Sequence, residues 1–309
     1  MKMNKRYPFC SVIYYTRQGW SNLLKDCVDP LIQQREKEGF RNDFALYFSD
    51  DQGEHIRLEL YMKTMVPDRE ACLVASIEKF LHAHPTQRRE KTLPLRNSFF
   101  VDLPNNTVYI NCFKPVMPPN AGFNSLEIIQ VRTAISALML EAFTENEVDQ
   151  DSLFNFYLCL QIVSLSVFGG ELDTAADALL GEFDSMVSRL STAECSRIAY
   201  QADQLVESNR DDLNDLLVVA EQGVLTTDTK WLAAWYQICE ELGGTRDSLR
   251  LFNDIGMFIR QHVNFREAKW NVLCMAVINR MLSKNNNIIH YKLKKSAYEK
   301  TEIKSGPTG

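Results

Sequence analysis

The sequence predicts an α+β fold, in which a small antiparallel sheet from the N-terminal third packs on a mainly helical C-terminal body. Strand-type patterns occur only before residue 114, whereas the apolar positions after residue 124 have helical spacing. The segment between them contains three prolines and a glycine, as expected of a loop. We therefore predict one domain over residues 1–309, with a mixed lobe at 1–113, a helical lobe at 125–284 and a polar tail at 285–309.

The first elements are a strand, a helix and a hairpin. Phe9 to Tyr15 is rich in β-branched and aromatic residues, which favours a strand. Trp20 to Arg35 has helical spacing, which Pro30 interrupts. Residues 44–48 and 55–62 flank a polar, glycine-containing turn, a pattern that predicts two antiparallel strands.

A helix and a second hairpin complete the mixed lobe. Pro67 begins a helix that runs to about Leu81, because its apolar residues recur every three or four positions. Residues 99–103 and 107–113 flank Pro104-Asn105-Asn106, which predicts a turn between two further strands.

The remainder of the chain predicts helices with recognisable first turns. Ser125 can cap a long helix that runs to about Phe143. A second helix runs from Asp151 to Phe168 and ends at two glycines. Ser191 and Glu194 have the spacing of a capping box. Further helices are expected near residues 173–190, 192–208, 211–222, 228–242, 246–262 and 264–284.

Composition indicates a cytoplasmic protein that binds no nucleic acid directly. The net charge of -6 lacks the basic excess that a nucleic-acid backbone attracts. The eight cysteines form no C-x-x-C pair and lie in apolar segments, as buried free thiols do. No apolar signal segment follows Met1. The most apolar run, Leu153 to Phe168, is short for a membrane span and contains Asn155 and Gln161, so we expect a buried helix.

The strand at His55 carries the strongest candidate site, because its polar residues alternate with Ile56, Leu58 and Leu60. Arg57 can bind a carboxylate with its guanidinium fork, and His55 can transfer a proton near neutral pH. Glu59 can act as a base or as the partner of Arg57. The alternative interpretation is a solvated strand face with no chemical role.

A second candidate lies near the C-terminus. Asn279 and Arg280 interrupt the apolar helix pattern, and buried polar groups are costly unless they have partners. Arg280 either anchors this helix to a carboxylate or lines a substrate cavity. His82 and His84 are a weak metal-binding pair because no third ligand is indicated, so no metal and no cofactor are expected.

The order of several short motifs resembles a known family. A Trp-led helix ends near Pro30-Leu31, a hairpin follows and ends in His55-Ile56-Arg57-Leu58-Glu59-Leu60, and Met275 to Met281 contains Asn279-Arg280. This arrangement resembles the stand-alone form of the C-terminal domain of lantibiotic dehydratases and thiopeptide biosynthesis proteins. The chain departs from the family at Glu59, where an arginine is usual, and at Met275, where a histidine is usual. The family's Arg-Tyr-Gly-Gly segment has no clear counterpart, and residues 120–123 lie in its approximate place.

The resemblance implies the biosynthesis of a ribosomally made, modified peptide. Its first implication is a lyase that eliminates glutamate from glutamylated Ser or Thr, as one half of a split dehydratase. His55 and Arg57 would then be catalytic, and Glu59, Asn279 and Arg280 would bind substrate. The implied partners are a precursor peptide with its leader and a glutamylating dehydratase protein. The alternatives are a [4+2] cycloaddition of the thiopeptide type or a non-catalytic peptide-binding subunit. A homodimer is one possible oligomeric state.

Overall fold

The computed structural model describes most of the chain and divides it into two compact units. The first unit comprises residues 1–157 and 257–264, and the second comprises 158–256 and 265–309. The described residues are 7–37, 43–62, 67–88, 102–119, 123–168, 183, 186–188, 190–222, 230–243 and 248–282. The predicted tail at 285–309, most of the predicted helix at 173–190, the Gly169-Gly170 stop and the loop residues 120–122 lie outside these ranges.

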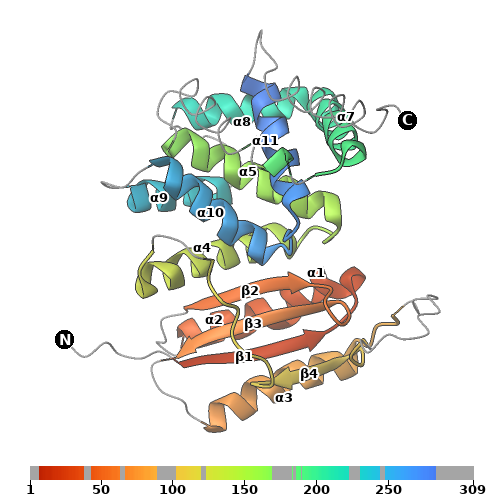
Figure 1. Ribbon diagram of the computed structural model, residues 1–309. Helices are drawn as coiled ribbons and strands as arrows, with labels where there is room; N and C mark the ends of the chain where they lie inside the picture. The colour runs from red at the N-terminus through yellow and green to blue at the C-terminus, as the bar shows by residue number, and fades with distance from the viewer. Residues whose placement is uncertain are drawn as a thin grey trace, which may run out of the picture. The chain divides into compact units, whose positions relative to one another are not determined.

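The first unit is built on a four-stranded antiparallel sheet with the strand order β2-β3-β1-β4 (Figure 1). Its strands are β1 (Tyr7–Tyr14), β2 (Phe44–Ser49), β3 (His55–Met62) and β4 (Thr107–Ile110). The predicted hairpin is confirmed, since β2 and β3 pair along their lengths. Of the second predicted hairpin, the strand at Thr107 is confirmed, but it pairs with β1. Residues 99–101 lie outside the described chain, and Leu103 donates its N–H to Gln52.

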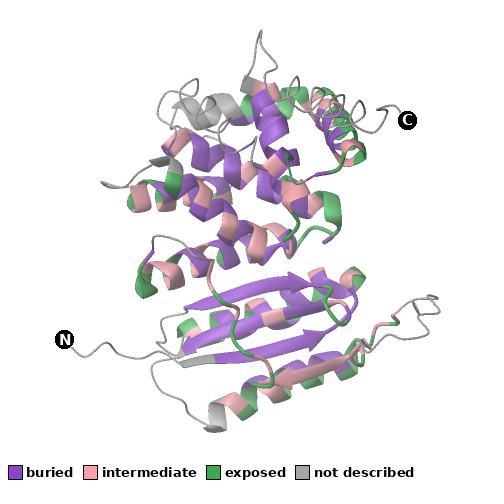
Figure 2. Ribbon diagram, in the orientation of Figure 1, coloured by how far each residue is buried: buried purple, intermediate pink, exposed green. Residues whose placement is uncertain are grey.

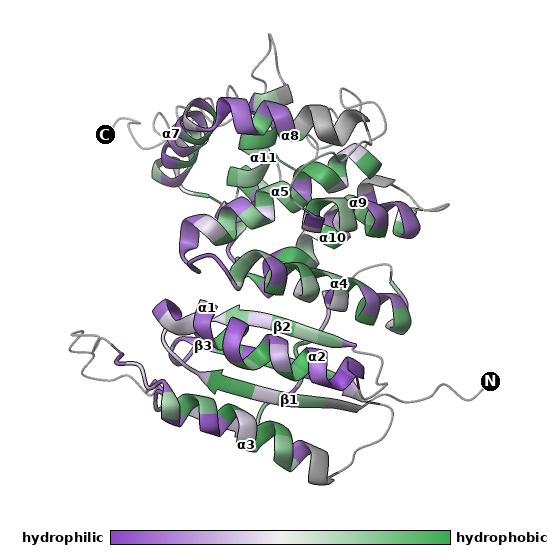
Figure 3. Ribbon diagram, turned by 180° about the vertical axis from the view of Figure 1, so that it is seen from behind, coloured by the Kyte–Doolittle hydropathy of each residue, from purple (hydrophilic) through white to green (hydrophobic). Residues whose placement is uncertain are grey.

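One face of the sheet is covered by the N-terminal helices α1 (Trp20–Leu23) and α2 (Asp29–Lys37), and Figure 3 shows α2 lying across this face. The Trp20 ring stacks on Phe48 of β2 with their centroids 4.9 Å apart. Pro30 does not break the helix. Instead, residues 24–28 form a π-helical turn whose last bond runs from Asp29 N to Leu24 O. A π-helical turn can accommodate a proline, which has no N–H to donate within the helix.

Helix α4 (Ser125–Phe143) protects the outer edge of β2. Ser136 Oγ accepts the N–H of Leu46 at 2.8 Å, and Thr133 Oγ1 accepts that of Phe44 at 3.1 Å. Edge strands otherwise present unpaired N–H groups to other chains, so these hydroxyls close the sheet on this side. Helix α3 (Pro67–Ala83), which the sequence predicted, contacts β4 at the opposite edge.

Asn124, and not Ser125, caps α4. Its side chain accepts the N–H groups of Leu126 and Glu127, and Glu127 in turn accepts the N–H of Asn124. The sequence prediction was one residue late because serine and asparagine are equally good caps, and only the backbone conformation distinguishes them.

We expect Asn124→Ala to lower the free energy of unfolding by about 1 kcal/mol, because two N–H groups of the first turn lose their acceptor. Urea-induced unfolding measures the change. Ser125→Ala is the matched control and is expected to stay within about 0.5 kcal/mol of the wild type. Equal effects of the two variants would contradict the assignment of the cap.

The second unit is helical in its described residues, and Trp235 is fully buried within it. The indole N–H of Trp235 lies 3.0 Å from Leu160 O and 3.1 Å from Ser164 Oγ, which gives this buried donor two acceptors. Four helices lie wholly in this unit: α7 (Thr192–Ser208), α8 (Arg210–Gln222), α9 (Lys230–Gly243) and α11 (Ala268–Leu282). Helices α5 (Gln150–Phe168) and α10 (Ser248–His262) each have residues in both units. The capping box at Ser191 is confirmed.

Two further predictions concern the cysteines and the most apolar helix. The eight cysteines are free, but Cys72 and Cys112 are exposed, so the expectation of buried thiols is wrong for these two. Helix α5 is the one helix among the described residues that is long and apolar enough to cross a membrane, and 67% of its most apolar window is buried within the protein.

Candidate functional site

The polar face of β3 is buried, which corrects the interpretation of it as a solvated face. Glu59 is fully buried, His55 and Tyr61 are nearly so, and 16% of the Arg57 side chain is exposed. Figure 2 shows β1, β2 and β3 mostly in the colour of buried residues. Two apolar clusters flank this face. One contains Ala45, Tyr47 and Tyr61 with Val116 and Ile129, and the other contains Cys10, Val12 and Tyr14 with Leu103, Tyr109 and Phe113.

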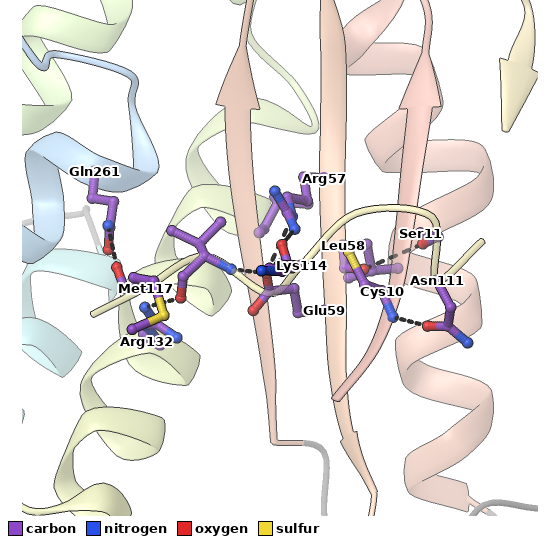
Figure 4. Close-up of polar contacts among 12 residues, drawn as sticks. Cys10, Ser11, Arg57, Leu58, Glu59, Asn111, Lys114, Met117, Arg132 and Gln261 are labelled. Atoms are coloured by element: carbon purple, nitrogen blue, oxygen red, sulfur yellow. Dashed lines mark hydrogen bonds and ion pairs between the residues drawn. The ribbon is translucent and has the colours of Figure 1, made fainter. Parts of the chain in front are cut away.

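Glu59 is the centre of the contacts on this face. Its Oε1 lies 3.1 Å from Arg57 Nε and accepts the N–H of Val116 at 2.6 Å (Figure 4). Its Oε2 accepts the hydroxyl of Tyr61 at 3.1 Å. A buried carboxylate is stable only when its oxygens have such partners. The structure therefore brings the predicted residues Arg57 and Glu59 together.

Arg132 of α4 completes the cluster and was not among the site residues predicted from the sequence. This guanidinium is 4% exposed, donates from Nη1 to Tyr61 Oη at 3.0 Å and lies over the ring of Tyr47. Within the described residues it contacts no carboxylate, and Tyr61 connects it to Glu59. The sequence signal for Arg132 was an arginine within an otherwise apolar helix pattern. The same signal identified Arg280 as a candidate.

The segment from Lys114 to Met117, called the strap below, crosses this face (Figure 4). Arg57 Nη2 donates to Lys114 O, and Arg132 Nη2 donates to Val116 O at 2.8 Å. The side chain of Gln261, near the end of α10, donates to Met117 O at 2.6 Å. The proline-rich loop of the sequence is thus an ordered cover over the polar face.

Burial determines the protonation of the neighbouring aromatic groups. It raises the pKa of Tyr61 to about 12, with Arg132 opposing the shift, and raises the pKa of Tyr47 well above its ordinary value. Both phenols are therefore neutral at pH 7 and act as hydrogen-bonding groups. Burial also lowers the pKa of His55, with a smaller opposing effect from the carbonyl of Gly53.

His55 lies at the end of β3 and has its own contacts. Its Nδ1 is 2.9 Å from Gly53 O, and its ring lies 4.9 Å from that of Tyr14. In the described part of the chain it makes no hydrogen bond to Arg57 or Glu59. The two predicted catalytic residues therefore lie on one strand face but do not form a hydrogen-bonded pair.

The second predicted site belongs to the helical unit. Arg280 Nη2 lies 2.8 Å from Asp203 Oδ1, which ties α11 to α7. Asn279 is buried, and Met275 is 2% exposed in the apolar interior. These contacts match the interpretation of Arg280 as a helix anchor. Among the described residues, no group of three or more His, Cys, Asp or Glu side chains is placed to hold a metal ion.

Comparison with solved structures identifies the fold. The chain is similar to a pyridine synthase from thiomuracin biosynthesis, TbtD, with a TM-score of 0.61 and 13% identity over 89% of this chain and 97% of that one. It is similar to TsrL with a TM-score of 0.55 and 13% identity over 95% and 99% of the two chains. A comparison with curated proteins gave no match.

The family assignment covers almost the whole chain. A family model described as the lantibiotic biosynthesis dehydratase C-terminal domain matches residues 10–297, which include most of the sheet, the strap and α11. The motifs at His55 and Asn279 lie within this match. The chain therefore belongs to the lantibiotic dehydratase C-terminal family, whose role is the modification of ribosomally made peptides.

Proposed function

We propose that the chain binds a precursor peptide and closes a ring in it by a formal [4+2] cycloaddition between two dehydroamino acids. One observation carries this proposal: the two arginines at family-motif positions are paired with carboxylates of the chain itself, Arg57 with Glu59 and Arg280 with Asp203. Elimination needs cations to hold the leaving glutamyl group. A guanidinium that already has a carboxylate partner attracts a second one far less.

Ring closure makes smaller demands on the side chains. It depends mostly on holding two reacting groups in position and on one dehydration, so it tolerates the loss of acid–base residues. Met275 cannot transfer a proton, and it is buried in the apolar interior. The likeness to a pyridine synthase over 97% of that protein's length is consistent with this reaction. The reaction would take place in the cytoplasm, where the eight free thiols stay reduced.

Glutamate elimination is the second candidate, and Arg132 is the observation in its favour. Arg57 and Arg132 carry two positive charges; among the described residues Glu59 is the carboxylate paired with Arg57, whereas Arg132 donates to Tyr61 and Val116. A glutamyl carboxylate would balance the remaining charge. In that case the chain is one half of a split dehydratase, and a partner protein supplies the glutamylated peptide.

Mass spectrometry of two substrates separates the candidates. The pure protein is incubated with a precursor peptide that already contains dehydroalanine and, separately, with the same peptide glutamylated on Ser or Thr. We expect the loss of water that accompanies ring formation in the first and no change in the second. Loss of the glutamyl group from the second would establish elimination, and no change in either, with partner proteins present, would make the chain a non-catalytic subunit.

Arg57→Ala is expected to lower the rate of the reaction about 10- to 100-fold, because the strand face loses the guanidinium that holds the strap and Glu59. The rate of product formation under saturating peptide measures the change. Glu141→Ala on the exposed side of α4 is the control and is expected to keep the wild-type rate. Full activity of Arg57→Ala would show that the polar face of β3 takes no part in the reaction.

A further inference from the structure

The strap is held by side chains that bind its main chain. Glu59 accepts the N–H of Val116, while Arg57, Arg132 and Gln261 donate to the carbonyl oxygens of Lys114, Val116 and Met117. These contacts bind N–H and C=O groups, which every peptide carries. They would hold another extended chain in the same way.

The composition of the strap is that of an extended peptide ligand. Pro115 precedes Val116, and Pro118 and Pro119 follow Met117, so the backbone is biased away from helix. The Val116 side chain packs beside Tyr47 and Tyr61, whereas Met117 is 78% exposed. One side chain therefore points inward and the next outward, as in peptides recognised through their main chain.

The binding groups themselves belong to rigid elements. Glu59 and Arg57 lie on the central strand β3, Arg132 lies on the long helix α4, and Gln261 lies near the end of α10. Four side chains from three separate elements thus converge on four consecutive peptide groups (Figure 4). A loop that only had to cover an apolar face would not require buried charges beneath it.

We propose that this cluster is a main-chain binding site for an extended segment of a peptide substrate, and that the strap occupies it as an internal competitor. The segment would place an apolar side chain where Val116 lies and would offer its N–H to Glu59 and its C=O groups to Arg57 and Arg132. This identification of the occupant rests on the proposed function. The strap then acts as an autoinhibitory contact that the substrate displaces.

A peptide copy of the strap tests the competition without any chemical turnover. The probe is the capped hexapeptide Lys-Pro-Val-Met-Pro-Pro, and its binding is measured by calorimetry. In the variant Pro115→Gly/Val116→Ala the strap loses its inward side chain and part of its bias toward an extended backbone, while Glu59, Arg57, Arg132 and Gln261 are unchanged. We expect the probe to bind this variant about tenfold tighter than the wild type, equivalent to about 1.4 kcal/mol.

Two controls make the test specific. Met117→Ala changes an exposed strap residue and is expected to bind the probe as the wild type does. A probe with N-methylvaline lacks the N–H that Glu59 accepts and is expected not to bind the double variant. Equal binding to the wild type and the double variant, or equal binding of the methylated probe, would overturn the proposal. If the double variant unfolds, Val116→Ala alone is measured against the same probes, with about a threefold gain expected.

The binding result is independent of the reaction. If neither substrate peptide is modified but the probe binds the loosened variant more tightly, the main-chain site stands and the proposed reaction fails. If a substrate peptide is modified but the probe shows no preference, the reaction stands and the strap is only a structural cover.

Discussion

Glu59→Ala is expected to lower the free energy of unfolding by about 3–5 kcal/mol, which is the usual cost of removing one partner from a buried ion pair. Glu59 is fully buried and accepts from Val116 and Tyr61 besides pairing with Arg57. Its removal leaves the Arg57 Nε, the Val116 N–H and the Tyr61 hydroxyl without their acceptor. Chemical denaturation with urea, read by tryptophan fluorescence, measures the change.

Two variants bracket this result. Glu59→Gln keeps an acceptor for Val116 but removes the charge, so an intermediate loss is expected. Glu141→Ala removes an exposed carboxylate from α4 and is expected to stay within about 0.5 kcal/mol of the wild type. If Glu59→Ala is as stable as Glu141→Ala, the polar face of β3 does not stabilise the fold.

The sequence predicted the elements well because their signals are local. Alternation along residues 55–62 marked β3, and the spacing of apolar residues marked α3, α4 and α5. The errors were also local. Asn124 and Ser125 are equivalent helix caps by residue type. Pro30 is accommodated by a π-helical turn, which no residue pattern predicts. The pairing of β4 with β1 depends on contacts between distant segments, which periodicity does not encode.

The candidate site was predictable only in part. Arg57 and Glu59 were predicted together because they share one face of a strand, and the structure pairs them on that face. The burial of that face was not foreseen, because it depends on the strap and on Arg132, which are 55 or more residues further along the chain. Glu59, the departure from the family motif, has the most contacts on this face. At the position where the family usually has an arginine, this chain thus has a carboxylate together with the hydrogen-bond donors that a buried carboxylate needs.

His262 is expected to make the protein less stable as the pH falls below about 6.5. It is fully buried, its ring lies 4.5 Å from that of Tyr47, and burial lowers its pKa to about 3. The nearby charge of Arg132 lowers this pKa further, while the carbonyl of Phe258 opposes the shift. The unfolded chain, with an ordinary histidine pKa near 6.5, therefore binds a proton that the folded protein excludes.

The sign of the effect follows from this difference. The contribution of His262 to stability is fully present above pH 6.5 and is lost progressively as the pH falls toward 3, at up to about 1.4 kcal/mol per pH unit. Between pH 6.5 and 5 the loss amounts to about 2 kcal/mol. His262→Phe keeps an aromatic ring beside Tyr47 but cannot be protonated, so its free energy of unfolding should fall less steeply with decreasing pH. Urea-induced unfolding at several pH values compares the two slopes.

The comparison of slopes separates His262 from other titrating groups. His55 also has a lowered pKa and contributes in the same direction, but it is present in both proteins and cancels in the difference. His82→Gln, which removes an exposed imidazole of α3, serves as the control for the loss of a histidine in itself. If the wild type and His262→Phe show parallel pH dependence, the imidazole is protonated within the fold at no cost. His262 directly follows Gln261, whose side chain donates to the strap. With parallel slopes, we would therefore also expect the strap to stay over the polar face when the pH falls.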